Sequence, residues 1–250
     1  MSDTNDPFFI GYLPVPAALK PFVKVLIALG VCGAIAMAFV LASGQQSPGP
    51  GVWDTSKVAT IEGHLSVDPY PVVYVDDPNT GYGVRAVLLV SAMKFGARDR
   101  TAAMDGQRVR VQGNFISREG REIFEIIDGE DDIVVASEGS AEPKVEALGE
   151  HRLKGEITDA KCFLGVMKPG YGKTHRACAV RCIAGGIPPL FVTRNADGEE
   201  TVFVLTNSSH GEINEAVLPY VSEPVEVQGS LERRGDMLVY AIDSDQIVRQ

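Results

Sequence analysis

Four side chains in one short stretch of the sequence have the chemistry of a metal or redox site. Cys162, Cys178 and Cys182 carry thiols and His175 carries an imidazole, the donor groups that zinc and other borderline-soft ions prefer in proteins. Cys178 and Cys182 are four positions apart and His175 precedes Cys178 by three, so a helix over residues 175–183 would present all three on one face. Cys162 ends the preceding predicted strand and is expected to reach the same face.

Four kinds of chemistry are compatible with these residues. The first is a structural disulfide from Cys162 to Cys178 or Cys182, which exported proteins favour and which leaves one thiol over. The second is a metal site in which His175 joins the three cysteines, a donor set typical of structural zinc, although the C-x15-C spacing is unfamiliar. The third is thiol–disulfide exchange, with neighbouring lysine and arginine residues favouring a thiolate. The fourth is haem or another cofactor, without the C-x-x-C-H motif of covalent c-type haem.

No catalytic set accompanies the cysteines. The sequence has no local Ser/His/Asp pattern, and residues 170–174 end like a phosphate-binding loop but lack its first glycine, because position 167 is methionine. We therefore expect a non-enzymatic protein without a resident cofactor, and zinc or another metal is the alternative that these residues would hold.

Proline and glycine frame the predicted helix. Pro169 and Gly170 form a turn before it, Thr174 is the expected N-cap, and Gly185 with Gly186 ends it. The segment is therefore predicted to be a turn and a short helix that leave the preceding strand and return to the next one.

The elements around this segment repeat an earlier part of the chain. Residues 109–126 and 225–242 each show an alternating strand that ends at a glycine, a polar turn and a second alternating strand, the pattern of a hairpin with one buried face. Upstream, two further pairs of segments match: 61–65 with 153–157, and 87–90 with 202–205. With a short helix expected over residues 213–220, each copy resembles the five-stranded OB-fold.

The predicted fold is mainly β, with one N-terminal transmembrane helix followed by two tandem OB-like five-stranded barrels. The expected parts are a cytoplasmic tail (1–24), a transmembrane anchor (25–43), a linker (44–51), a first OB-like domain (52–136), an acidic linker (137–150) and a second OB-like domain (151–250) that contains the cysteine insertion.

The spacing of the two copies isolates the cysteines. The first-strand glycines Gly63 and Gly155 are 92 positions apart, whereas the later landmarks Gly120 and Gly235 are 115 apart. The second copy therefore has about 23 extra residues between its first and third strands, and all three cysteines after the anchor fall there. An insertion that holds every reactive thiol is the natural place to look for function.

Residues 25–42 contain no charged side chain and are long enough, as a helix, to span the hydrocarbon core of a membrane. Lys20 and Lys24 precede the run and the next basic residue is Lys57, so the positive-inside tendency predicts an inner-membrane anchor with the barrels in the periplasm. The alternative is a cleaved signal peptide, for which both the leader and the apolar run are long. Either interpretation exports the barrels.

Composition limits the partners. Of 250 residues, 45% are hydrophobic and 22% are charged, enough to bury a core, and the net charge is −10. Because nucleic acid is held largely by neutralising phosphates, this charge argues against a nucleic-acid partner. The bilayer and a membrane protein complex are the expected partners.

The cysteine segment and its neighbouring strands resemble an uncharacterised family of exported bacterial proteins. The shared pattern is G-x-I-x-D-x-x-C, C-x-x-x-C-x-x-x-G and V-x-V-x-G, found at 155–162, 178–186 and 225–229 of this chain. It covers about 95 residues of the C-terminal domain and implies an exported OB-fold-like domain with no established activity. One anchor before an OB-barrel is also similar to the haem chaperone of cytochrome c maturation, but the H-x-x-x-Y motif that attaches haem is missing, so only the architecture carries over.

These observations lead to three hypotheses of function. The first is a non-enzymatic, membrane-anchored periplasmic protein that serves as an accessory or assembly subunit of a membrane complex. A respiratory redox complex is one example of such a complex. The alternative is a metal-binding or thiol–disulfide protein that acts through Cys162, His175, Cys178 and Cys182. A small-ligand-binding module that uses the mouth of a barrel is a third.

Overall fold

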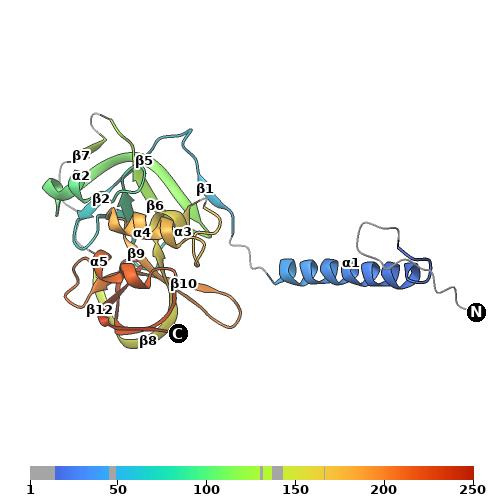
Figure 1. Ribbon diagram of the computed structural model, residues 1–250. Coiled ribbons are helices and arrows are strands. Elements are labelled where there is room, and N and C mark those ends of the chain that lie inside the picture. The colour runs from blue at the N-terminus through green and yellow to red at the C-terminus, as the bar shows by residue number, and fades with distance from the viewer. Residues whose placement is uncertain (1–14, 45–48, 130–131, 137–142, 166) are drawn as a thin grey trace, which may run out of the picture. The chain divides into compact units, whose positions relative to one another are not determined.

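A computed structural model describes residues 15–44, 49–129, 132–136, 143–165 and 167–250 (Figure 1). The chain divides into two compact units, Met1–Pro48 and Gly49–Gln250. The first holds the apolar helix and the second holds all of the β-structure.

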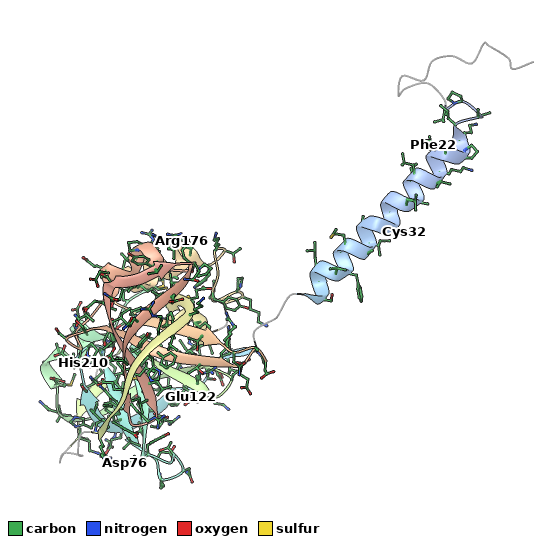
Figure 2. All side chains as sticks on the ribbon, turned by 90° about the horizontal axis from the view of Figure 1, so that it is seen from below. Phe22, Cys32, Asp76, Glu122, Arg176 and His210 are labelled. Carbon is green, nitrogen blue, oxygen red and sulfur yellow. The ribbon has the colours of Figure 1, made fainter. Side chains whose placement is uncertain are left out.

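The first unit contains one long helix, α1 (Lys20–Ser43), whose first turn includes a proline, where no helical hydrogen bond is lost. Its mean hydropathy of 2.7 and its length are enough to cross a membrane. None of its residues is buried, and side chains such as Phe22 and Cys32 project outward from it (Figure 2). The predicted span 25–43 lies within α1, whereas residues 1–14 of the predicted tail lie outside the described residues.

The second unit begins with a closed barrel. Its strands are β2 (Ala59–Ser66), β3 (Val72–Asp76), β4 (Val84–Val90), β5 (Arg108–Arg118) and β6 (Arg121–Ile126). β3 pairs with β2 and β4, β5 pairs with β2 and β6, and parallel pairing of β4 with β6 closes the barrel. The short strands β1 (Gly51–Trp53) and β7 (Ile133–Val135) add to β5.

The second barrel has the same strand order. Its strands are β8 (Val145–Asp159), β9 (Pro189–Arg194), β10 (Glu200–Asn207), β11 (Pro224–Arg234) and β12 (Met237–Arg249), closed as β10-β12-β11-β8-β9. The parallel pair is β10 with β12, which corresponds to β4 with β6. The two predicted five-stranded barrels are thus confirmed. β8 begins at Val145, within the range predicted to be linker, and residues 137–142 of that range lie outside the described residues.

Two glycines show that the copies match in detail. A Cβ on Gly63 would lie 2.2 Å from the carbonyl oxygen of Tyr74, and a Cβ on Gly155 would lie 2.3 Å from that of Val192. In each barrel the glycine lets the first strand bend tightly over the second, a known use of glycine at a barrel corner. The recurrence of a glycine in the sequence therefore reflects the same close backbone approach in both barrels.

The helices complete the correspondence. α2 (Arg98–Thr101) and η1 (Ala102–Met104) follow β4, and α5 (Asn214–Val217) and η2 (Leu218–Tyr220) follow β10, where the sequence predicted a short helix. The second barrel adds α3 (Ala160–Leu164) and α4 (Arg176–Ala184) between its first two strands. Figure 1 shows these two helices between the barrels.

Three hydrophobic cores hold the second unit together. One fills the first barrel around Leu65 and Phe124, and another fills the second barrel around Phe191 and Tyr240. The third lies between the barrels, with contributions from both: Tyr70, Val72, Tyr74, Leu88, Val90, Ile116, Ile123, Ala160, Cys162, Phe163, Leu164, Cys182, Ile187, Leu190, Val192 and Val204. Because burying a large apolar side chain contributes about 1.5–3 kcal/mol, this shared core makes the two barrels one compact body.

Polar contacts cross the same junction. The Tyr70 hydroxyl donates to Asn214 Oδ1 (2.7 Å), and the Asn214 amide nitrogen donates in turn to the carbonyl oxygens of Ile183, in α4, and Ile187, just after it. Burial raises the pKa of Tyr70, so the hydroxyl stays protonated and keeps its role as donor. Tyr70 follows β2 in the first barrel and Asn214 begins α5 in the second, so this bond fixes how the barrels meet.

Candidate metal centre

The strand end and the two inserted helices bring the three thiols together. β8 ends at Asp159, whose Oδ1 accepts a hydrogen bond from the Cys162 amide (2.8 Å) and so caps α3. Cys162 therefore lies one turn beyond the strand rather than at its end, where the sequence pattern placed it. α4 presents Cys178 and Cys182 one turn apart, on the side facing Cys162.

The sulfur atoms of Cys178 and Cys182 lie at similar distances from that of Cys162, and all three lie within 4.8 Å of one another. Cys162 Sγ lies 3.6 Å from Cys178 Sγ and 3.8 Å from Cys182 Sγ. A disulfide needs a separation near 2.05 Å, and all three cysteines are free. The predicted structural disulfide from Cys162 is thus wrong in this structure, because the two helix cysteines lie about equally far from it and neither is bonded. Tetrahedral ligands bound to zinc at about 2.3 Å lie about 3.8 Å from one another, which is the spacing of these sulfurs.

Burial distinguishes the three members of this sulfur cluster (Cys162, Cys178 and Cys182). Cys162 and Cys182 are buried in the core between the barrels, whereas Cys178 is partly exposed. The cluster therefore has two sulfurs fixed by packing and one that opens toward solvent, through which an ion could enter.

His175 does not belong to the same group of possible ligands as all three cysteines. The residue occupies the N-cap position of α4 without a capping side-chain bond, where Thr174 was expected. Its Nε2 lies 3.0 Å from Asp159 Oδ2, and both side chains are buried. Asp159, Cys162 and His175 form a second group of possible ligands within 4.8 Å of one another. The predicted Cys₃His set is therefore divided into two groups that share Cys162.

A lysine from the other barrel completes the sulfur cluster. Lys94 Nζ lies 2.8 Å from Cys178 Sγ and 3.5 Å from Cys182 Sγ. The loop that carries it, residues 91–96 after β4, is held by the insertion: the Gly96 amide donates to Gly185 O, and the ammonium of Lys161 in α3 donates to Ser91 O and Met93 O. Lys94 was not recognised in the sequence, because it lies 84 positions from Cys178 and outside any motif.

The charges in the cluster reinforce one another. The hydrogen bond to Cys178 raises the pKa of Lys94, so its amine is an ammonium. The hydrogen bond from Cys162 and the nearby Lys94 lower the pKa of the Cys182 thiol. The hydrogen bond to Cys182, burial and the neighbouring Asp159 raise the pKa of Cys162. Of the pair Cys162 and Cys182, the contacts therefore favour a thiolate at Cys182 and a protonated thiol at Cys162, which a bound cation would help to lose its proton.

Sequence reasoning found the four donors but not their surroundings. Cys162, Cys178 and Cys182 meet as expected, and His175 lies beside them. Asp159, Lys161 and Lys94 were missed as functional residues. Asp159 had a signal, since it falls in the D-x-x-C pattern; the two lysines had none.

Comparisons with known proteins add no assignment: no family model, no curated protein and no solved structure matches the chain. The resemblances drawn from short sequence patterns stay predictions, and the arguments about function rest on the geometry of the sulfur cluster.

Proposed function

We propose that this chain is a membrane-anchored protein whose barrels bind one thiophilic metal ion through Cys162, Cys178 and Cys182. The observation that carries the proposal is the sulfur spacing, 3.6 and 3.8 Å, which matches ligands around a single ion. Three thiolates form a soft donor set, which suits zinc and cuprous ions and disfavours magnesium and calcium.

The similar distances of Cys178 and Cys182 from Cys162 also weigh against the thiol–disulfide alternative. A disulfide joins two particular sulfurs at about 2.05 Å, and in exchange the third sulfur acts as the attacking thiolate. In the cluster, the buried Cys162 is nearly equidistant from Cys178 and Cys182, so no pair is singled out. An ion at the centre uses all three sulfurs equally.

His175 and Asp159 serve as a support for Cys162 in this proposal. One carboxylate oxygen of Asp159 accepts from the Cys162 amide and the other faces His175 Nε2 at 3.0 Å. With both Asp159 oxygens committed, the pair fixes the backbone that carries Cys162. Partners of this kind orient the residues that bind the metal and are important for its affinity.

The setting of the site belongs to the same proposal. The apolar helix α1 and the lysines before it support an inner-membrane anchor with the barrels in the periplasm. A tethered, non-enzymatic metal site suits an accessory or assembly subunit of a membrane complex. Met93 and Phe95, which flank Lys94, are 78% and 61% exposed and offer apolar surface beside the cluster for such a partner.

The test uses the full-length protein in detergent micelles, reduced and free of metal. Titration with Zn²⁺ against a chromophoric chelator should show one ion per chain, and Cd²⁺ should produce thiolate charge-transfer absorption. Cys178→Ser removes the least buried sulfur and should weaken Zn²⁺ binding by more than the roughly 10- to 100-fold cost of losing an outer-shell partner.

Cys32→Ser is the matched control, because this cysteine lies in α1 and outside the cluster. It should bind Zn²⁺ like the wild type. Absence of binding by the reduced wild type, or equal binding by Cys178→Ser, would show that the cluster is not a metal site.

A further inference from the structure

The ion in the sulfur cluster would bring together charges from both barrels. Three thiolates and one divalent ion have a net charge of −1, and the Lys94 ammonium, in contact with two of the sulfurs, supplies the missing positive charge. Isolated charges are costly in a protein core unless they are paired. With a monovalent ion, the same neutrality would require one of the three cysteines to stay protonated.

The position of Lys94 is built into the fold. A Cβ on Gly185 would lie 1.9 Å from the Lys94 carbonyl oxygen, so the loop and the end of α4 are in direct backbone contact. Met93 has a positive φ of 60°, an uncommon conformation for a residue other than glycine. Its carbonyl is held by Lys161 at 2.9 Å. The loop is thus fixed on both sides of Lys94 by the insertion of the second barrel.

Within the described part of the chain, the charged and titratable groups facing the Lys94 ammonium are those of the sulfur cluster. It donates to Cys178 Sγ and Cys182 Sγ, and the charged groups that act on it among the described residues are Cys178, Cys182 and Cys162. An ammonium that is paired with sulfurs in place of a carboxylate has the placement of a counter-ion for thiolates. N–H···S bonds of this kind also tune the electron density of a metal-bound sulfur.

We propose that the cluster is selective for a divalent thiophilic ion such as Zn²⁺, and that Lys94 is its positioning residue: the first barrel supplies the counter-charge for a metal held by the second. This inference rests on the proposed metal function. Loading the site then also ties the 91–96 loop to α4 and strengthens the junction between the barrels, because the same lysine belongs to both.

The test compares the wild type with Lys94→Gln and Lys94→Arg in full-length protein. Lys94→Gln should weaken Zn²⁺ binding about 10- to 100-fold, the usual effect of losing an outer-shell partner, and Lys94→Arg, which keeps the positive charge, should recover most of it. In the Co²⁺-loaded protein, loss of the charge-assisted N–H···S bonds in Lys94→Gln, whose neutral amide is a weaker donor, should move the thiolate-to-metal absorption to longer wavelength. A purely structural role for Lys94 would not shift this band.

Two further readouts complete the design. Zn²⁺ should protect all three sulfurs of the native wild type from alkylation, and it should slow amide exchange in residues 91–96 of the wild type but not of Lys94→Gln. Lys154→Gln, which removes a lysine that is 70% exposed on the second barrel, is the matched control and should behave like the wild type.

The outcomes separate the two proposals. If the wild type binds no thiophilic ion, the metal function itself is overturned. If the wild type binds Zn²⁺ but Lys94→Gln shows the same affinity and the same Co²⁺ absorption, the metal site stands and the role of Lys94 is overturned. Equal weakening by Lys94→Arg and Lys94→Gln would overturn the charge argument.

Discussion

The two barrels have one strand order but join their first two strands differently. In the first barrel, residues 67–71 connect β2 to β3; in the second, residues 160–188 connect β8 to β9 and contain α3, α4 and the sulfur cluster. The closed sheet is the same in both, so it serves as a scaffold, and the chemistry lies in what is inserted between strands. The first barrel contributes in another way: its 91–96 loop brings Lys94 to the cluster.

The contacts between the barrels are reciprocal. Lys94 of the first barrel reaches the sulfurs of the second, while Lys161 of the second reaches Glu125 and two backbone carbonyls of the first. Each barrel therefore completes a polar site of the other.

The largest expected effect on stability comes from removing the contact of Lys161 with the first barrel. Lys161→Met removes the partner of Glu125, which lies beside it with only 12% of its side chain exposed. An uncompensated buried charge of this kind costs about 3–5 kcal/mol. We expect a loss of that size in the free energy of unfolding, measured by denaturant titration of the metal-free protein.

Lys154→Met, at an exposed position on β8, is the control and should lie within about 0.5 kcal/mol of the wild type. Equal stability of the two variants would show that the Lys161–Glu125 pair does not hold the barrels together.

A second prediction tests whether the barrels are equivalent. Gly63→Ala and Gly155→Ala each place a Cβ within 2.3 Å of a carbonyl oxygen on the next strand. Each substitution should cost about 3 kcal/mol, at the upper end for overpacking a tight site, and the two losses should be similar. Thermal unfolding followed by circular dichroism provides the measurement.

Gly81→Ala, in the loop after β3, meets no atom within 4 Å and should leave the melting temperature nearly unchanged. A clear difference between the losses at Gly63 and Gly155 would mean that the bend of the first strand is not the shared structural element that we infer.

The smallest effect concerns the residue after each of these glycines, His64 in the first barrel and Glu156 in the second. Burial raises the pKa of Glu156, although its carboxylate accepts a hydrogen bond from the Gly172 amide and faces Arg194, His175 and Glu223. A carboxyl group whose folded pKa is raised contributes most to stability below its ordinary pKa of about 4.3, and this contribution is lost as the pH rises through the raised value.

Glu156→Gln should therefore gain stability relative to the wild type as the pH rises from about 4 to 7. Denaturant titrations of both proteins across this range measure the difference. His64→Gln is the comparison at the equivalent position. A wild-type protein that gains stability over Glu156→Gln with rising pH would contradict a raised pKa at Glu156.

Much of the fold and part of the site followed from local sequence patterns. The period-2 alternation around 109–126 and 225–242 predicted the hairpins, and the offset between the copies located the insertion. The disulfide prediction failed because spacing shows that sulfurs can meet but not how far apart packing holds them. The helical spacing also did not show that His175 Nε2 lies 3.0 Å from Asp159 Oδ2, in a group with Cys162 rather than with all three cysteines.

The sequence by itself determined what depends on neighbouring residues: an apolar helix long enough for a membrane, two sets of five strands, and Cys178 and Cys182 one helical turn apart. The tertiary structure alone decided that each barrel contributes a lysine to the other. Lys94 contacts Cys178, 84 positions away, and Lys161 contacts Ser91, 70 positions away. The physical reason is that periodicity encodes which face of an element is buried, whereas a contact between two barrels depends on how their surfaces pack. That packing joins a thiol cluster to the cation that balances it.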